Sequence, residues 1–121
     1  MRLAAVNSTR RQTVSPELWE YVVARDARAI WEHLWSRISY GAFLQMRRPI
    51  CIVELADPLE SLRCSGYQTV DHVKDGPMMG KRAPSDEHHL VAMCSFHNVE
   101  HPPSKELRAF ERYYLGLGRD E

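Results

Sequence analysis

Three cysteines and one closely spaced histidine constrain the fold of this 121-residue chain more than any other feature. Cys51 and Cys64 are separated by twelve residues, whereas only two residues separate Cys94 from His97. Two residues between ligands let a tight turn wrap a metal ion, and three thiolates with one imidazole close a tetrahedral zinc site that has no position left for water. The spacing therefore predicts a structural zinc site formed by Cys51, Cys64, Cys94 and His97, which would supply much of the folding free energy of so short a chain.

The alternative is that the cysteines are free thiols and that His97 is a surface residue. Free cysteine is commonly buried as a small apolar side chain, so this interpretation stays open. An odd number of cysteines disfavours a framework of disulfides. The zinc interpretation is favoured because it uses every cysteine of the chain.

Length limits the chain to a single domain, and charge gives no sign of a nucleic-acid partner. The chain is long enough for one domain with a modest core and too short for two. Its formal net charge is zero, so bulk charge does not indicate a nucleic-acid partner. Several basic residues fall in expected loops, where solvated surface is their simplest role; they are Arg10, Arg11, Arg47, Arg48, Lys81 and Arg82.

The N-terminal residues carry no targeting or membrane signal. No apolar run reaches about 18 residues, so no membrane span is expected. Residues 1–14 are rich in Arg, Ser and Thr and lack the apolar core of a secretory signal. We therefore expect a flexible basic tail on a cytoplasmic protein.

Residues 15–49 are expected to form a helical N-terminal part. Ser15 can cap a helix, Pro16 fits the first turn, and Glu17 suits the positive end of the helix dipole. Apolar residues then recur at three- and four-residue steps to about Ser39, with a candidate break near Asp26. This stripe is either core or a surface for a protein partner; it consists of Leu18, Trp19, Val22, Val23, Ile30, Trp31, Leu34, Trp35 and Ile38.

Residues 50–101 are expected to hold the strands of a small α+β domain. The run Ile50–Leu55 is β-prone, and Tyr67–Val70 alternates as a strand does before ending at Asp71-His72. A long polar loop should follow over 74–87. Leu90–Met93 then predicts a second short strand or an extended turn.

Two helices should complete a single domain over residues 15–121. A short helix is expected to begin near Cys94, and Pro102-Pro103-Ser104 then interrupts the chain. A C-terminal amphipathic helix is expected within residues 103–116, because Leu107, Phe110, Tyr114 and Leu115 recur on or near one face.

The pair Asp71-His72 at the expected strand end is a candidate hydrolytic site. Histidine can take a proton from water near neutral pH, and the neighbouring acid, which points to the other side of the strand, can hold a divalent metal. Asn98 on the short helix is a candidate second ligand. A lone Asp-His pair is nevertheless common by chance, and His88, His89 and His101 taken alone would more often be surface residues.

Taken together, the motif residues resemble the HNH endonuclease family, and most closely the small HNH proteins of phages and actinobacteria. The resemblance covers the stretch from Cys51 to Asn98. It rests on Cys51…Cys64…Asp71-His72-Val73…Met79-Gly80-Lys81-Arg82-Ala83-Pro84-Ser85…His89-Leu90-Val91…Cys94-x-x-His97-Asn98. It implies a ββα-metal core stapled by zinc, to which the residue pattern adds a flanking helix on each side.

The resemblance also implies roles for individual residues. His72 matches the general base, and Asp71 and Asn98 match the ligands of a catalytic Mg²⁺ or Mn²⁺. His89 matches the middle position of the motif, which orients the loop that bears the base. Lys81 and Arg82 fall where the family approaches phosphate, and the zinc ligands are matched by Cys51, Cys64, Cys94 and His97.

Three features depart from the family pattern. The middle position is His rather than Asn, and His88 is a neighbouring alternative for it. The last position is Asn98 rather than His, and its oxygen would still suit Mg²⁺ or Mn²⁺. Residues 27–49 have no counterpart in the family and suggest an oligomer or partner surface.

The function implied by the resemblance is metal-dependent hydrolysis of DNA phosphodiester bonds, as nicking or weakly specific cleavage. Small HNH proteins of phages often act beside a terminase in genome packaging, so a packaging partner is an implied possibility. The main alternative is a zinc-stapled DNA- or protein-binding module without catalysis. A small helical partner protein with free thiols is a further alternative.

Overall fold

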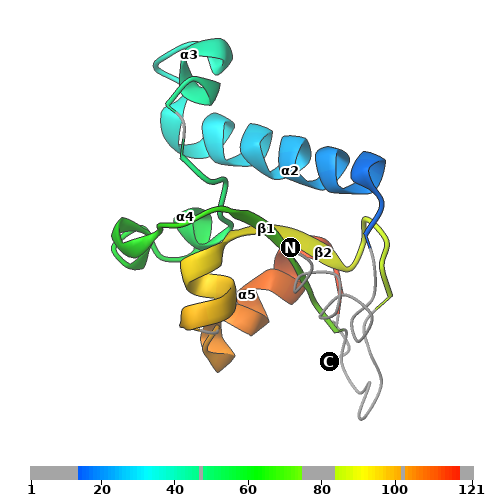
Figure 1. Ribbon diagram of the computed structural model, residues 1–121. Coiled ribbons are helices and arrows are strands. Elements are labelled where there is room, and N and C mark those ends of the chain that lie inside the picture. The colour runs from blue at the N-terminus through cyan, green and yellow to red at the C-terminus, as the bar shows by residue number, and fades with distance from the viewer. Residues whose placement is uncertain (1–13, 47, 75–83, 102, 118–121) are drawn as a thin grey trace.

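The computed structural model describes residues 14–46, 48–74, 84–101 and 103–117. Its centre is an antiparallel hairpin of β1 (Gln68–His72) and β2 (Leu90–Cys94), with Gln68 opposite Cys94 and His72 opposite Leu90. Figure 1 shows α2 (Pro16–Ile30) crossing one side of the hairpin and α5 (Lys105–Leu115) lying on the other. Both expected strands are confirmed, and the second is a true strand rather than an extended turn.

The hairpin is buried on both faces, which explains why β2 is apolar throughout. Successive strand residues point to opposite faces. On one face, Val91 and Met93 pack in a cluster that includes Leu107 and Phe110 of α5. On the other face, Ala92 packs in a cluster with residues of α2 and the segment that follows it, including Ala27, Ile30 and Phe43. One strand therefore serves two small cores.

The N-terminal helix begins as expected but ends earlier. The hydroxyl of Ser15 accepts a hydrogen bond from the Leu18 amide at 3.1 Å. The helix passes through Asp26 without a break and continues as the π-helical turn η1 (Trp31–Trp35). The chain then starts a new short helix, α3 (Tyr40–Leu44), because the Ser39 hydroxyl accepts from the Ala42 amide at 3.0 Å. The helical turns therefore end at Trp35, a few residues before the expected end near Ser39, and the candidate break near Asp26 does not occur.

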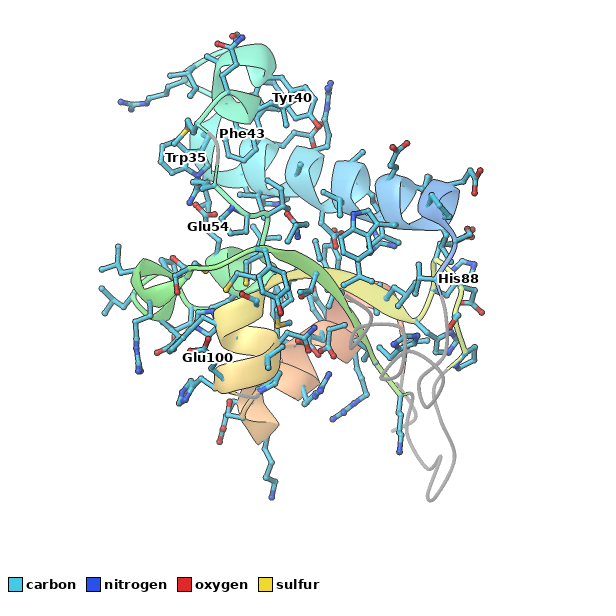
Figure 2. The ribbon with its side chains drawn as sticks, in the orientation of Figure 1. Trp35, Tyr40, Phe43, Glu54, His88 and Glu100 are labelled. Carbon is cyan, nitrogen blue, oxygen red and sulfur yellow. The ribbon has the colours of Figure 1, made fainter. Side chains whose placement is uncertain are left out.

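The tryptophan end of this helical part packs within the chain. Figure 2 shows Trp35, Tyr40 and Phe43 gathered above Glu54. The indole of Trp35 donates a hydrogen bond to the Glu54 carboxylate at 2.7 Å, and its ring centroid lies 6.0 Å from that of Phe43. Trp31 and Trp35 are half-buried, which favours the core interpretation of the stripe. A protein partner for this end stays a prediction.

The β-prone run Ile50–Leu55 does not form a strand. It makes one backbone hydrogen bond to β2, from the Ile52 amide to the Ala92 carbonyl, and then turns into the helix α4 (Val53–Ala56). Its apolar residues are buried against β2 and α5 by this turn, so tertiary packing overrides the β propensity. The 3₁₀ turn η2 (Glu60–Arg63) then leads to Cys64.

The C-terminal elements agree with the sequence pattern. The short helix η3 (Phe96–Glu100) begins two residues after Cys94, and α5 is capped by the Ser104 hydroxyl. Helix α5 ends at Leu115, and the next residue, Gly116, has a left-handed φ of 77° that suits glycine. Residues 1–13, Lys81 and Arg82 lie outside the described residues. Among the helices of the described ranges, none is long and apolar enough to cross a membrane.

Candidate metal centre and the end of the hairpin

Cys51, Cys64, Cys94 and His97 come together in one cluster, with their ligand atoms all within 4.8 Å of one another. The imidazole Nδ1 of His97 lies 3.9 Å, 3.6 Å and 3.2 Å from the sulfurs of Cys51, Cys64 and Cys94. A tetrahedral zinc ion with ordinary bond lengths would hold sulfur and nitrogen about 3.6 Å apart. Donor types and spacing thus fit a zinc ion, and the cluster could hold a structural metal.

The hairpin positions this cluster. Cys94 ends β2 inside the core, and the backbone amide of His97 donates to its sulfur at 3.4 Å. Cys64 lies at this cluster just before a tight turn that leads into β1. Gly66 allows the turn, because its φ is 90°. A Cβ on Gly66 would lie 1.9 Å from the Ser95 hydroxyl oxygen, so a larger residue would push the Cys64 segment away from η3.

The thiols of Cys51 and Cys94 resist ionisation unless a cation joins them. Hydrogen bonding to Cys64 together with burial raises the pKa of the Cys51 thiol to about 12. Hydrogen bonding to Cys51 together with burial raises the pKa of the Cys94 thiol to about 12. A divalent metal reverses this preference because it binds thiolates, so metal uptake should release protons.

Glu60 is a partner of His97 that no pattern in the sequence indicates. The Nε2 of His97 donates a hydrogen bond to the Glu60 carboxylate at 2.8 Å, while Nδ1 faces the sulfurs. A carboxylate on the second nitrogen of a ligating histidine fixes its tautomer and ring orientation. With a metal at the cluster, the Glu60 carboxylate would position the His97 ring.

We expect Glu60→Gln to weaken zinc affinity by about 10- to 100-fold, because the amide cannot orient and polarise the imidazole as the carboxylate does. Competition with a chromophoric chelator measures this change. His101→Gln is the matched control, since the exposed His101 imidazole also lies near the same Glu60 oxygen, at 4.0 Å. Equal affinities of Glu60→Gln and wild type would show that Glu60 does not position the ligand.

The expected catalytic pair lies at the end of β1, with its two side chains on opposite faces of the strand. Asp71 is largely buried, and its carboxylate accepts a hydrogen bond from Nη1 of Arg108 at 2.6 Å. Nε2 of His72 lies 2.9 Å from the hydroxyl oxygen of Ser85. Arg108, from α5, is a partner of Asp71 that sequence reasoning missed.

Asn98 lies on the Asp71 side of β1 without contacting Asp71. Its amide nitrogen donates to the Thr69 hydroxyl at 2.9 Å and to the Val70 carbonyl at 3.4 Å. Thr69 is two residues before Asp71 and so shares its face of the strand. Asn98 therefore lies on the same face of β1 as Asp71, next to a residue two positions before it.

The two candidates for the middle motif position differ in their surroundings. The side chain of His88 is 70% exposed, whereas that of His89 is 13% exposed. Nδ1 of His89 lies 2.8 Å from the Asp86 carboxylate, and the His89 carbonyl accepts from the Val73 amide, directly after His72. Of the two histidines, His89 is therefore the more buried one and the one whose backbone is hydrogen-bonded beside His72.

A second acid joins the Asp71 ion pair from α5. Nη1 of Arg108 also donates to Glu111 Oε1 at 2.9 Å, and Glu111 is fully buried. Burial and the nearby Asp71 raise the pKa of Glu111 to about 7, and burial raises the pKa of Asp71 despite Arg108. One guanidinium therefore serves two buried carboxyl groups.

Fold and site together define a small α+β domain with a two-stranded antiparallel sheet and a Cys3His cluster that could hold a structural metal such as zinc. The chain matches no protein-family model, no curated protein and no solved structure. The function must therefore be argued from the site itself.

Proposed function

We propose that this chain is a metal-dependent endonuclease of the HNH type that hydrolyses DNA phosphodiester bonds by nicking or weakly specific cleavage. The observation that carries the proposal is the order β1, β2, η3 around the Cys3His cluster, with Asp71-His72 closing β1. Asn98 of η3 is hydrogen-bonded back to that strand. This order of two strands and a helix supports the proposal, since a ββα-metal core is built from the same elements.

In this proposal His72 takes the proton from the attacking water, since imidazole titrates near neutral pH. Mg²⁺ or Mn²⁺ bound at Asp71 and Asn98 supplies charge neutralisation at the phosphate. Asn98 offers its carbonyl oxygen, because its nitrogen donates to Thr69 and Val70. The zinc cluster keeps η3 against the hairpin and so preserves the positions of these groups.

We expect His72→Ala to lower cleavage by about 100- to 10,000-fold while leaving zinc content and fold intact, because only the proton acceptor is lost. The measurement is nicking of supercoiled plasmid with Mg²⁺, Mn²⁺ or EDTA. His88→Ala is the matched control: its exposed side chain should be dispensable. Unchanged cleavage by His72→Ala would remove His72 as the base.

A second candidate is a zinc-stapled module that binds DNA or protein without catalysis. The contact that favours it is the Arg108–Asp71 ion pair, which gives Asp71 a cation from within the chain. This candidate would be supported if the wild-type protein shifts DNA in a gel but does not nick plasmid, whichever metal is added. Metal-dependent nicking would exclude it.

A further inference from the structure

Two buried carboxylates, one on β1 and one on α5, accept hydrogen bonds from the same nitrogen atom. Nη1 of Arg108 donates to Asp71 Oδ2 at 2.6 Å and to Glu111 Oε1 at 2.9 Å. Asp71 comes from the end of β1, and Glu111 lies one turn beyond Arg108 on α5. Both acids are buried, with Asp71 8% exposed and Glu111 fully covered. Each is therefore within reach of one small cation placed at the Arg108 nitrogen.

This cluster is incompletely satisfied. When both acids are ionised, one guanidinium leaves a net negative charge in a buried place, which is unfavourable. Glu111 Oε2 is buried and has no hydrogen-bond partner among the described residues. Protonation would remove the charge, but the new hydroxyl would still lack an acceptor. Buried polar atoms are nearly always hydrogen-bonded, so this oxygen is available to a ligand that the described residues do not supply.

We propose that Asp71 and Glu111 form a binding site for a divalent cation, Mg²⁺ or Mn²⁺, and that Arg108 is the internal cation which the metal displaces. Carboxylate oxygens are the ligands that these metals prefer. The metal takes the place between the two acids and gives Glu111 Oε2 its partner. Helix α5, outside the motif region, thereby supplies both a metal ligand, Glu111, and the cation that competes with the metal, Arg108.

The inference rests on the proposed function in taking Asp71 as a metal ligand, but it makes a separate claim about α5. A salt bridge that must break before metal binds lowers the apparent affinity of the site. Arg108 should therefore set the divalent concentration at which the site fills. Removing Arg108 should tighten binding, whereas removing the Glu111 charge should weaken it.

The test is Mn²⁺ binding to the zinc-loaded full chain, followed by the electron paramagnetic resonance signal of free Mn²⁺. We expect Glu111→Gln and Asp71→Asn to weaken binding by roughly tenfold or more, and Arg108→Gln to tighten it by a similar factor. The matched controls on the exposed side of α5 are Glu106→Gln and Lys105→Gln, which make the same charge changes. Both controls should bind Mn²⁺ as wild type does.

Three results would overturn the inference: no Mn²⁺ binding that depends on Asp71, unchanged affinity in Glu111→Gln, or unchanged or weaker affinity in Arg108→Gln. If no Mn²⁺ binding depends on Asp71, the partner of Glu111 Oε2 is water rather than a metal ion. If Glu111→Gln fails to fold, Glu111→Asp keeps the charge but withdraws the oxygens, and it should also weaken binding. Thermal melting with and without Mn²⁺ gives a second readout, in which the stabilisation should be larger for Arg108→Gln than for wild type.

Binding and cleavage separate this inference from the nuclease proposal. Mn²⁺ binding with the expected pattern but no plasmid nicking would keep the site and reject the nuclease. Nicking that persists while Glu111→Gln binds Mn²⁺ normally would keep the nuclease and reject the role of α5.

Discussion

Cys94→Ser is expected to lose the bound metal and to leave the chain largely unfolded at neutral pH. Structural zinc contributes roughly 10–16 kcal/mol in small domains, which matches or exceeds the about 5–15 kcal/mol that holds a typical domain folded. Cys94 is fully buried, and its sulfur is the one nearest to His97 Nδ1, at 3.2 Å. Serine cannot replace a thiolate ligand there, so the site should fail as a whole.

Thermal melting followed by circular dichroism measures this loss. Wild-type protein stripped with EDTA is the matched reference, because it should melt as the variant does. EDTA should have no further effect on Cys94→Ser. Melting of the variant at the wild-type temperature, with and without EDTA, would exclude a structural metal and favour the free-thiol interpretation.

Asp26→Ala is expected to cost about 3–5 kcal/mol of folding free energy, because it leaves several buried groups without a partner. Asp26 is fully buried on α2. One of its oxygens accepts from the Ala92 amide of β2 at 2.7 Å, and the other accepts from the Tyr114 hydroxyl of α5 at 2.6 Å and from Arg25 at 2.8 Å. A single carboxylate thus joins both helices to the hairpin.

Denaturation by urea with zinc present measures this cost. Glu20→Ala is the matched control on the same helix, and since Glu20 is exposed we expect a change within about 0.5 kcal/mol. Asp26→Asn keeps an acceptor, so its loss of folding free energy should lie between those of Asp26→Ala and Glu20→Ala. A loss in Asp26→Ala no larger than in Glu20→Ala would mean that the buried network does not hold the layers together.

The four residues of the Cys3His cluster could be predicted from sequence because much of their signal is local. The turn from Cys94 to His97 is encoded by two intervening residues, and the only other cysteines complete the donor set. The ends of β1 and α5 were also predictable, since alternation and capping act over a few residues. Such features do not depend on what packs against them.

The groups that serve the site through long-range contacts were not predictable in this way. Arg108 meets Asp71 across 37 positions of sequence, and Glu60 meets His97 across the same separation. Asp26 suggested a helix break, because a lone acid on an apolar stripe gives no hint of its partners. The run Ile50–Leu55 is β-prone in sequence, and this propensity does not reveal the turn into α4.

The most direct test of this account is the metal content of the chain purified without chelator, measured by atomic emission and repeated after exchange with Co²⁺. We predict one zinc ion per chain, and a cobalt form whose visible spectrum is that of a tetrahedral site with thiolate ligands. The three thiols should then react with Ellman's reagent only after the metal is removed. A folded chain without metal whose thiols react at once would contradict the account.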